Sequence, residues 1–144
     1  MKAAVYRAPM RSRRDDVDFG ATIGRARSLG LCGFGERGSS AARLARRIER
    51  FRNVDRDSFV WTRDPDGLYW LGRITGSYFH DTDEEAAAVD LAHVRECHWL
   101  TTPLLEPDVP AAMVATFGRG GRNFQRTHDA NVGAESERIW DALS

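Results

Sequence analysis

The sequence predicts a small α+β domain in which about five strands form a mixed β-barrel and two or three helices flank it. Three observations support this fold class. The 144 residues suit a single core, and 42% of them are apolar. A hairpin pattern in the middle of the chain is rich in aromatic residues, and an arginine-rich segment before it has the apolar period of a helix.

The first part of the chain alternates short extended segments with loops. Residues 3–7 predict a first strand, and the polar residues 11–16 predict a loop. Residues 21–29 have weak helical character. The glycine-rich residues 30–35 then predict a short apolar segment. Because glycine has no side chain, another backbone segment or a ligand can come close to it there.

A helix is predicted over residues 41–51, with Ser39 and Ser40 available as its N-cap. Its apolar side chains recur at helical spacing, at Leu44, Ile48 and Phe51. Arginines occupy much of the remainder, so we expect an amphipathic helix with a cationic outer face. The arginines are Arg43, Arg46, Arg47 and Arg50.

Residues 59–63 and 68–74 predict two antiparallel strands joined by a tight turn. The turn, residues 64–67, has the sequence Asp-Pro-Asp-Gly, which supplies the residue types that a reversal needs. Side chains alternate between the two faces of a strand, so Trp61 lies on one face of the first strand and Trp70 lies on one face of the second. We expect large aromatic rings to gather on one surface of the sheet, as a core or as a pocket for a flat ligand.

The rest of the chain predicts one further long strand and several short elements. The acidic residues 81–85 predict a solvated loop, and residues 91–100 predict a strand. Pro110 suits the first position of a short helix over residues 111–117. A last strand is expected over residues 123–127. The predicted organisation is a domain of residues 1–128 followed by a C-terminal helical tail or extension, residues 129–144.

The net charge is zero, but the charges are segregated along the chain. Residues 1–56 contain 14 Lys or Arg against six Asp or Glu, whereas residues 57–110 contain three against 11. A basic N-terminal half can supply the phosphate-facing surface of a nucleic-acid binder. Arginine abundance alone is weak support, because only Lys2 among the 21 basic residues is lysine, a bias typical of a GC-rich genome.

Four motifs occur in an order that resembles a known group of domains. They are VYRA at residues 5–8, LGLCGFGE at 29–36, GRITGSY at 72–78 and HVRECHW at 93–99. In this order they resemble the PUA-like superfamily, especially the EVE-like domains attached to Mrr-type restriction endonucleases. The resemblance covers roughly residues 1 to 128. EVE-like proteins often carry tryptophan after the Gly-[apolar]-Gly segment, where this chain has Gly35 and Glu36.

The resemblance implies a PUA-like barrel that binds nucleic acid, DNA or RNA, without catalysing a reaction. Several relatives hold a modified base flipped into an aromatic pocket. The candidate base-binding residues are Phe34, Gly35, Trp61, Trp70, Tyr78 and Trp99. The candidate phosphate-binding residues are Arg7, Arg13, Arg14, Arg119 and Arg122. The alternative for any one of these rings is a place in the core, which is the more common role of a large aromatic side chain.

Two other function classes stay open. One is an RNA-processing enzyme of the ASCH kind, which would need titratable groups converging in the pocket, for example His93 with Arg95 or Asp90. The other is a nucleotide or small-molecule binding module, whose binding would not depend on salt. No cofactor is expected. A metal site of His93, Cys97 and His98 is disfavoured, because strand alternation points His98 away from the other two.

The sequence also suggests a cellular context. It contains no membrane-length apolar run and no secretory signal, so we expect a cytoplasmic protein. Cys32 and Cys97 are expected to be buried thiols. The resemblance further suggests a stand-alone reader in a defence or restriction system, with a separate effector nuclease as a possible partner.

Overall fold

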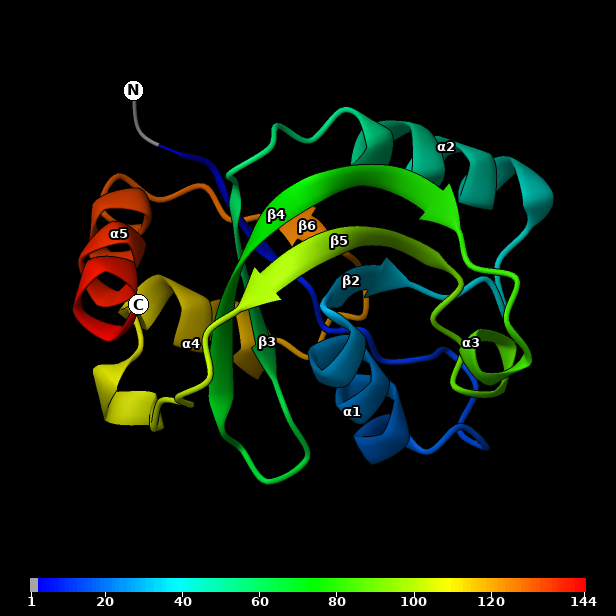
Figure 1. Cartoon of the computed structure of the whole chain (residues 1–144), viewed down its shortest axis with the longest axis horizontal. Coiled ribbons are helices and arrows are strands. Elements are labelled where there is room, and N and C mark those ends of the chain that lie inside the picture. Colours follow the sequence, from blue (N-terminus) through cyan, green and yellow to red (C-terminus); the bar gives the residue numbers. More distant parts are fainter. Residues whose placement is uncertain (1–2) are drawn as a thin grey trace.

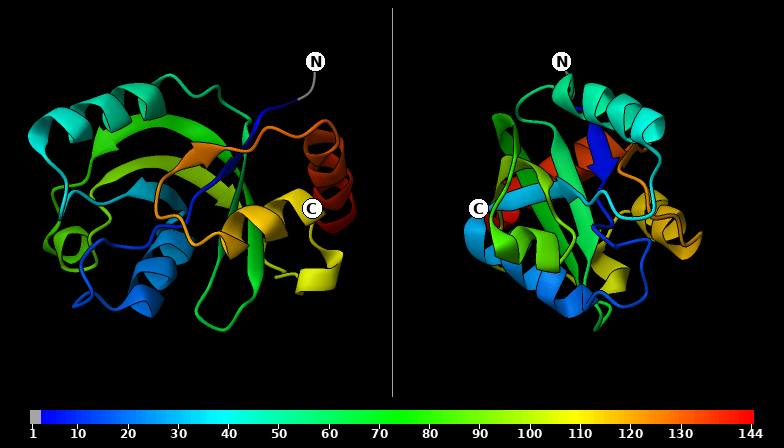
Figure 2. Two further views of the ribbon diagram at one scale, coloured as in Figure 1. Left: turned by 180° about the vertical axis from the view of Figure 1, so that it is seen from behind. Right: turned by 90° about the vertical axis from the view of Figure 1, so that its right-hand side faces the viewer.

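The computed structural model of the protein describes residues 3–144, which form a six-stranded mixed sheet with helices on both faces (Figure 1, Figure 2). The spatial order of the strands is β2-β5-β4-β3-β1-β6. Within residues 3–144, β1 and β3 pair in parallel and the other neighbours pair antiparallel. The strands are β1 (Val5–Arg7), β2 (Leu31–Phe34), β3 (Phe59–Arg63), β4 (Tyr69–His80), β5 (His93–Trp99) and β6 (Gln125–Arg126).

The sheet is open, which corrects the predicted barrel. Strands β2 and β6 are its two edges and do not pair with each other within the described chain. The strands on the β6 side are only three and two residues long, so the hydrogen-bonded ladder ends before it can reach β2. Strand β4 curves instead, with a register shift between Ile74 and Tyr78, and a helix lies along the curved sheet (Figure 1).

Five α-helices are described within residues 3–144, where the sequence predicted two or three. Two of the sequence-predicted helices begin at side-chain caps: Asp18 accepts from the Ala21 amide, and Ser40 accepts from the Arg43 amide. The helices are α1 (Phe19–Leu29), α2 (Ala41–Arg52), α3 (Glu84–Ala88), α4 (Ala111–Gly118) and α5 (Val132–Leu143), with a 3₁₀ turn, η1 (Glu106–Asp108).

Apolar side chains form two clusters on opposite faces of the central strands. The first cluster lies between the sheet and helices α1 and α2, and it includes Phe34, Phe51 and Trp70. The second lies between the sheet and helices α4 and α5, and it includes Trp61 and Tyr69. Strand β3 and the part of β4 that pairs with it are therefore buried on both faces.

The expectation that the hairpin aromatics share one surface is wrong. Thr62 is paired with Trp70, and Trp61 is paired with Leu71. Since cross-strand partners lie on the same face, this register places Trp61 and Trp70 on opposite faces of the sheet. The sequence pattern could not supply the register, because both faces of these strands are apolar.

The glycine-rich segment makes close backbone contacts, as the sequence indicated. A Cβ atom on Gly33 would lie 1.9 Å from the carbonyl oxygen of His93 on β5. A Cβ atom on Gly35 would lie 2.1 Å from the carboxyl carbon of Asp90. Only glycine fits at either position, so β2 and the segment after it press directly on β5 and on the turn before β5.

The remaining elements agree with the sequence apart from their bounds. Strand β4 continues to His80, beyond the predicted end of the second arm, and α3 begins at Glu84, inside the acidic residues 81–85 that were predicted as a loop. Helix α5 packs on the second cluster through Ile139 and Trp140. The predicted division of the chain at residue 128 stays a prediction. Among the described residues, every helix is too short or too polar to cross a membrane.

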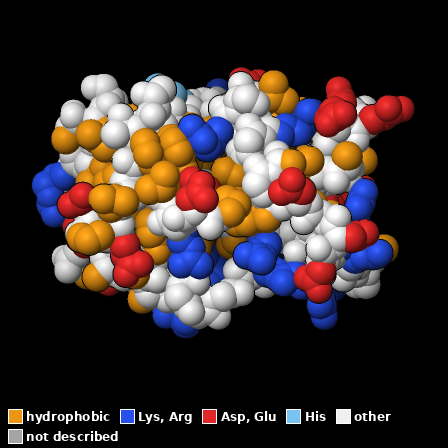
Figure 3. All heavy atoms as spheres, turned by 90° about the horizontal axis from the view of Figure 1, so that it is seen from below, with side chains coloured by type: hydrophobic (Ala, Val, Ile, Leu, Met, Phe, Trp, Pro, Cys, Tyr) orange, Lys and Arg blue, Asp and Glu red, His pale blue; other side chains and the backbone are white. Residues whose placement is uncertain are grey.

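The face of the molecule turned away from α2 carries both signs of charge. In Figure 3, acidic and basic side chains are interspersed with apolar groups over this face. Such mixing produces no extended field of a single sign. This face therefore has little attraction for a polyanion.

Replacing Trp61 by alanine should lower the free energy of unfolding by about 3 to 5 kcal/mol. Trp61 has no exposed surface, and its indole N–H donates to the Ser136 hydroxyl of α5 at 3.1 Å. Urea denaturation followed by circular dichroism measures the loss. Leu143→Ala, at a side chain that is 38% exposed, is the control and should change the value by less than about 0.5 kcal/mol. A loss below about 1 kcal/mol in Trp61→Ala would contradict the core assignment.

Candidate nucleic-acid interface

A pocket of about 870 Å³ opens between helix α2 and the β1–β6 edge of the sheet. Its walls come from four parts of the chain that are distant in sequence: the loop after β1, strand β2, helix α2 and the segment leading into β6. The lining residues are Tyr6, Arg13, Phe34, Arg43, Arg46, Arg47, Arg50, Phe51, Asn53, Val54, Asn123, Phe124, Gln125 and Arg126.

Four aromatic rings form a continuous row along the floor of this pocket. Phe34 lies 5.1 Å from Phe51, which in turn meets the face of Phe124 edge-on at 4.9 Å. Phe124 stacks on Tyr6 with ring centroids 5.0 Å apart and planes 14° from parallel. Phe34 and Phe51 are buried, whereas Tyr6 and Phe124 are partly exposed and so offer ring surface to a flat ligand.

All six charged residues that line the pocket are arginines. Four of them, listed above, project from α2 at positions i, i+3, i+4 and i+7, which lie on one face of a helix. Arg47 also covers the ring of Phe34, with its guanidinium carbon 4.4 Å from the ring centroid. The arginines on this face of α2 form the expected cationic outer face, and they also line the pocket.

Arg47 lies close to several other positively charged side chains of the pocket. Its pKa is lowered from the ordinary value by burial and then by repulsion from Arg13, Arg50 and Arg43, with Asp90 as the opposing influence. The repulsion between like charges in the free protein is reduced when an anion binds among them. The electrostatics of the pocket therefore favour an anionic ligand.

Helix α2 is held over the sheet by the buried guanidinium of Arg95 on β5. Arg95 is 3% exposed, and it donates to the backbone carbonyls of Phe51 and Val54 at the C-terminal end of α2. It also donates to the carbonyl of Gly76, in the irregular part of β4, at 2.8 Å. A cation at this end of a helix is favoured by the helix dipole. Arg95 thus positions the arginine-bearing wall of the pocket.

The opposite wall is positioned by Arg7, which the sequence assigned to phosphate binding. Its guanidinium is buried and donates to the Asn123 carbonyl at 3.2 Å and the Gln125 side-chain oxygen at 2.8 Å. Two further hydrogen bonds go to the carbonyl and hydroxyl of Thr116. These contacts fix the segment that carries Phe124, and they occupy most of the donors that a phosphate would use.

Asp90 fixes the segment between β2 and α2. Its carboxylate accepts from the backbone amides of Glu36 and Arg37 at 2.9 and 3.2 Å, and from the Ser12 hydroxyl at 2.6 Å. Asp90 has a positive φ of 52°, a conformation that costs a non-glycine residue free energy. The buried carboxylate therefore joins the arginine-rich first loop to the turn that precedes α2.

Among the sequence-predicted base-binding residues, Phe34 lines the pocket. Gly35 packs on Asp90, and Tyr78 touches the edge of Phe51. The tryptophans lie in the core clusters with their N–H groups bonded: Trp61 to Ser136, Trp70 to the Asp64 carboxylate and Trp99 to the Leu31 carbonyl. Their assignment to base binding stays a prediction.

The sequence-predicted phosphate-binding arginines are spread over three surfaces. Arg13 lines the pocket and donates to the Asn123 side-chain oxygen. Arg14 is exposed beside Asp16, and Arg119 lines a second pocket together with Arg7. Arg122 donates to the carbonyl of Ser12 at 2.7 Å. Their role in phosphate binding likewise stays a prediction.

Sequence reasoning missed the residues that form most of the pocket. The spacing of the α2 arginines was visible, but nothing local indicated that this face would turn toward an aromatic floor. Tyr6 and Phe124 lie 118 positions apart, and they stack because β1 pairs with β6. Such pairs are not visible in sequence periodicity.

Comparisons with known proteins bear on the fold. No family model matches the sequence, and no curated protein matches it. The structure is similar to the YTH domain of the Zygosaccharomyces rouxii MRB1 protein, solved in complex with N6-methyladenosine RNA. The TM-score is 0.52 at 10% sequence identity, over 98% of this chain and 86% of that one. The protein therefore has a YTH-like α+β fold.

Replacing Arg95 by methionine should lower the free energy of unfolding by about 3 kcal/mol, because buried carbonyls lose their donor while the packing volume is kept. Amide hydrogen exchange in α2 should become faster at the same time. Chemical denaturation and exchange mass spectrometry measure the two effects. Arg73→Met is the matched control, since Arg73 is less buried and donates to the Asp57 carbonyl from the outside of β4. Equal losses in the two variants would contradict the role assigned to Arg95.

Proposed function

We propose that the protein is a non-catalytic nucleic-acid reader that holds a nucleobase in the pocket beside α2. The observation that carries the proposal is the combination of two partly exposed aromatic rings, Tyr6 and Phe124, with a lining whose charged groups are all arginine. Aromatic faces bind bases of any sequence, and guanidinium groups bind phosphates. The ligand chemistry that satisfies both is that of a nucleotide within a strand.

The size and contacts of the pocket fit a base with its sugar. A volume of about 870 Å³ lies within the range of small-ligand sites, roughly 300 to 1,000 Å³. Holding a base outside its stack costs a few kcal/mol, and each aromatic contact returns about 1 to 3 kcal/mol. Because Tyr6 and Phe124 stack on each other, a base would stack on one of them, and this contact would offset part or all of the cost.

The α2 arginines are proposed to follow the phosphate backbone of the strand. Three of them, Arg43, Arg46 and Arg50, are exposed, whereas Arg47 is partly buried against Phe34. A base in the pocket would leave its flanking phosphates near this row. Arg13 and Arg126 stand on the other side of the opening, so the strand would cross between two groups of positive charge.

The finer identity of the ligand rests on resemblance. The structural neighbour was solved with N6-methyladenosine RNA, and the sequence motifs resemble EVE-like domains within the PUA-like superfamily. We therefore propose that a modified base is the preferred ligand. A cytoplasmic location, a defence or restriction role and a separate effector nuclease are proposals that rest on the sequence alone.

The chemistry of the pocket favours a reader over an ASCH-like enzyme. Its lining contains arginines, amides and Tyr6, and it offers no carboxylate or histidine that could exchange a proton near neutral pH. His93, named as a possible catalytic group, contacts Phe34 from outside this lining. The small-molecule alternative differs from the reader in its salt dependence.

The protein should bind short single-stranded oligonucleotides, with a preference for a strand containing N6-methyladenosine over the same strand containing adenosine. Fluorescence anisotropy with matched RNA and DNA strands at 50 and 200 mM NaCl measures both effects. Three phosphate contacts would reduce affinity roughly 20-fold over this salt range.

Phe124→Ala should weaken binding about 5- to 150-fold, the equivalent of 1 to 3 kcal/mol of stacking. Arg50→Glu should weaken binding and flatten the salt dependence.

Three controls separate the possible outcomes. Arg138→Glu reverses an exposed arginine on α5, remote from the pocket, and should leave affinity unchanged. Arg119→Glu with Arg122→Glu tests the basic rim that the sequence predicted. Absence of binding by the wild-type protein at 50 mM NaCl would contradict the nucleic-acid proposal and favour the small-molecule module. A cleaved or altered oligonucleotide would contradict the non-catalytic part.

A further inference from the structure

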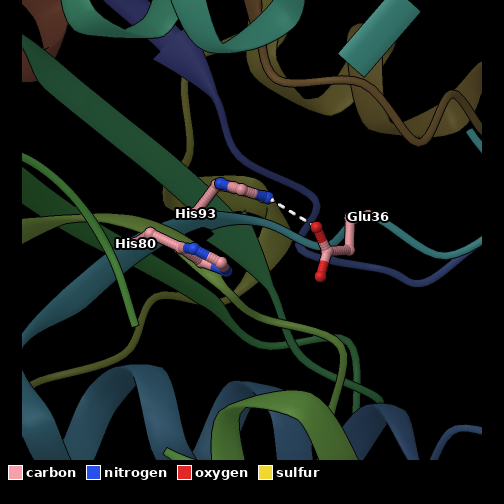
Figure 4. A group of neighbouring side chains, drawn as sticks. All are labelled: Glu36, His80 and His93. Carbon is pink, nitrogen blue, oxygen red and sulfur yellow. Dashed lines mark hydrogen bonds and ion pairs between the residues drawn. The ribbon is translucent and has the colours of Figure 1, made fainter. Parts of the chain in front are cut away.

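Three potential metal ligands converge at the far end of the sheet from the hairpin turn, next to the pocket (Figure 4). His80 ends β4 and is paired directly with His93, the first residue of β5. Glu36 follows β2 and points toward the same place. One nitrogen of each imidazole and one carboxylate oxygen all lie within 4.8 Å of one another.

The distances suit a tetrahedral ion. Zinc binds imidazole nitrogen and carboxylate oxygen at about 2.0 to 2.2 Å, which places two ligand atoms about 3.3 Å apart. His93 Nε2 and Glu36 Oε2 are already 3.1 Å apart. The rings of His80 and His93 stack with centroids 4.8 Å apart. Because His80 and Glu36 are exposed, a rotation of their side chains suffices to bring their ligand atoms within bonding distance of one ion.

His93 is already oriented as a metal-binding histidine would be. Its Nδ1 is hydrogen-bonded to the Tyr78 hydroxyl at 2.8 Å, which leaves Nε2 directed at Glu36. Histidines that bind metals usually hold the second ring nitrogen in such a hydrogen bond. In its hydrogen bond with Glu36, Nε2 carries the ring proton; when Nε2 binds a metal, the ring proton lies on Nδ1 and is donated to the oxygen of the Tyr78 hydroxyl.

We propose that Glu36, His80 and His93 bind one zinc ion. Two imidazoles and one carboxylate are a donor set that zinc accepts, with a fourth position left open to solvent. The charge balance is favourable, since a divalent cation meets the carboxylate of Glu36.

The competing explanation is that the hydrogen bond from His93 to Glu36 simply anchors the segment after β2. That role needs neither His80 nor a cation. His80, on a separate strand, is the third potential ligand. Only zinc binding requires it, so His80 distinguishes the two explanations. The metal set of His93, Cys97 and His98 that the sequence disfavoured is a different one, and the fold buries Cys97 beside Cys32 and leaves His98 exposed beside Trp140.

The test titrates Zn²⁺ into the full chain, freed of metal with EDTA, by isothermal calorimetry. We expect one ion per chain with a dissociation constant of about 10 µM or tighter, and a melting temperature that rises with Zn²⁺ concentration. Co²⁺ should give visible d–d bands without the near-ultraviolet thiolate band that cysteine ligation produces. Absence of stoichiometric binding, or a thiolate band, overturns the proposal.

His80→Ala and Glu36→Gln should each weaken Zn²⁺ binding at least tenfold. Both replace exposed side chains, and their melting temperatures without metal show whether the fold is kept. His98→Ala and His128→Ala are the matched controls, because these exposed histidines lie elsewhere, and both should bind as the wild type does. Unchanged affinity in His80→Ala and Glu36→Gln, or a loss in either control, overturns the proposal. Neither result bears on oligonucleotide binding, which is measured separately with EDTA present.

Discussion

The buried guanidinium of Arg95 is the interaction on which the arrangement of the pocket depends. It joins the last carbonyls of α2 to the irregular part of β4, and its own strand β5 lies between β4 and β2. Burial lowers the pKa of Arg95, yet the group remains charged, because even a lowered arginine pKa lies far above neutrality. Three backbone carbonyls replace the water that the charge has lost. The helix therefore has one fixed position over the sheet, and so do the arginines on its face.

Arginine has two physically distinct roles in this chain. Arg7 and Arg95 are buried, bond to carbonyls and define the two walls of the pocket. The α2 arginines and Arg13 line the opening, where they repel one another. The first role stabilises the fold, while the second leaves unfavourable electrostatic energy that a bound anion would relieve. A high arginine content by itself distinguishes neither role, since the buried Arg7 and the pocket arginines of α2 occur within the same basic residues 1–56.

The aromatic residues also divide into two groups. Trp61, Trp70 and Trp99 are nearly or fully buried, with each indole N–H bonded, so they stabilise the two core clusters. Tyr6 and Phe124 remain partly exposed beside the arginines. The densest aromatic stretch of the sequence thus builds the sheet, whereas the partly exposed rings come from β1 and from the residue before the edge strand β6. A hairpin buried on both faces has to carry large apolar groups, and an open sheet edge leaves room for a ligand.

The sequence by itself determined the local elements: the capped helix from Ala41, the hairpin across residues 64–67, the strand containing His93 to Trp99 and the glycines that press β2 onto β5. Caps, turns and apolar periods act within a few residues, so they can be recognised without the rest of the chain. Only the tertiary structure decided that the sheet stays open, that Trp61 and Trp70 lie on opposite faces and that Arg7 is buried. It also brought Tyr6 to Phe124 and His80 to Glu36. These outcomes depend on strand register and on pairing between distant segments, and sequence periodicity contains neither.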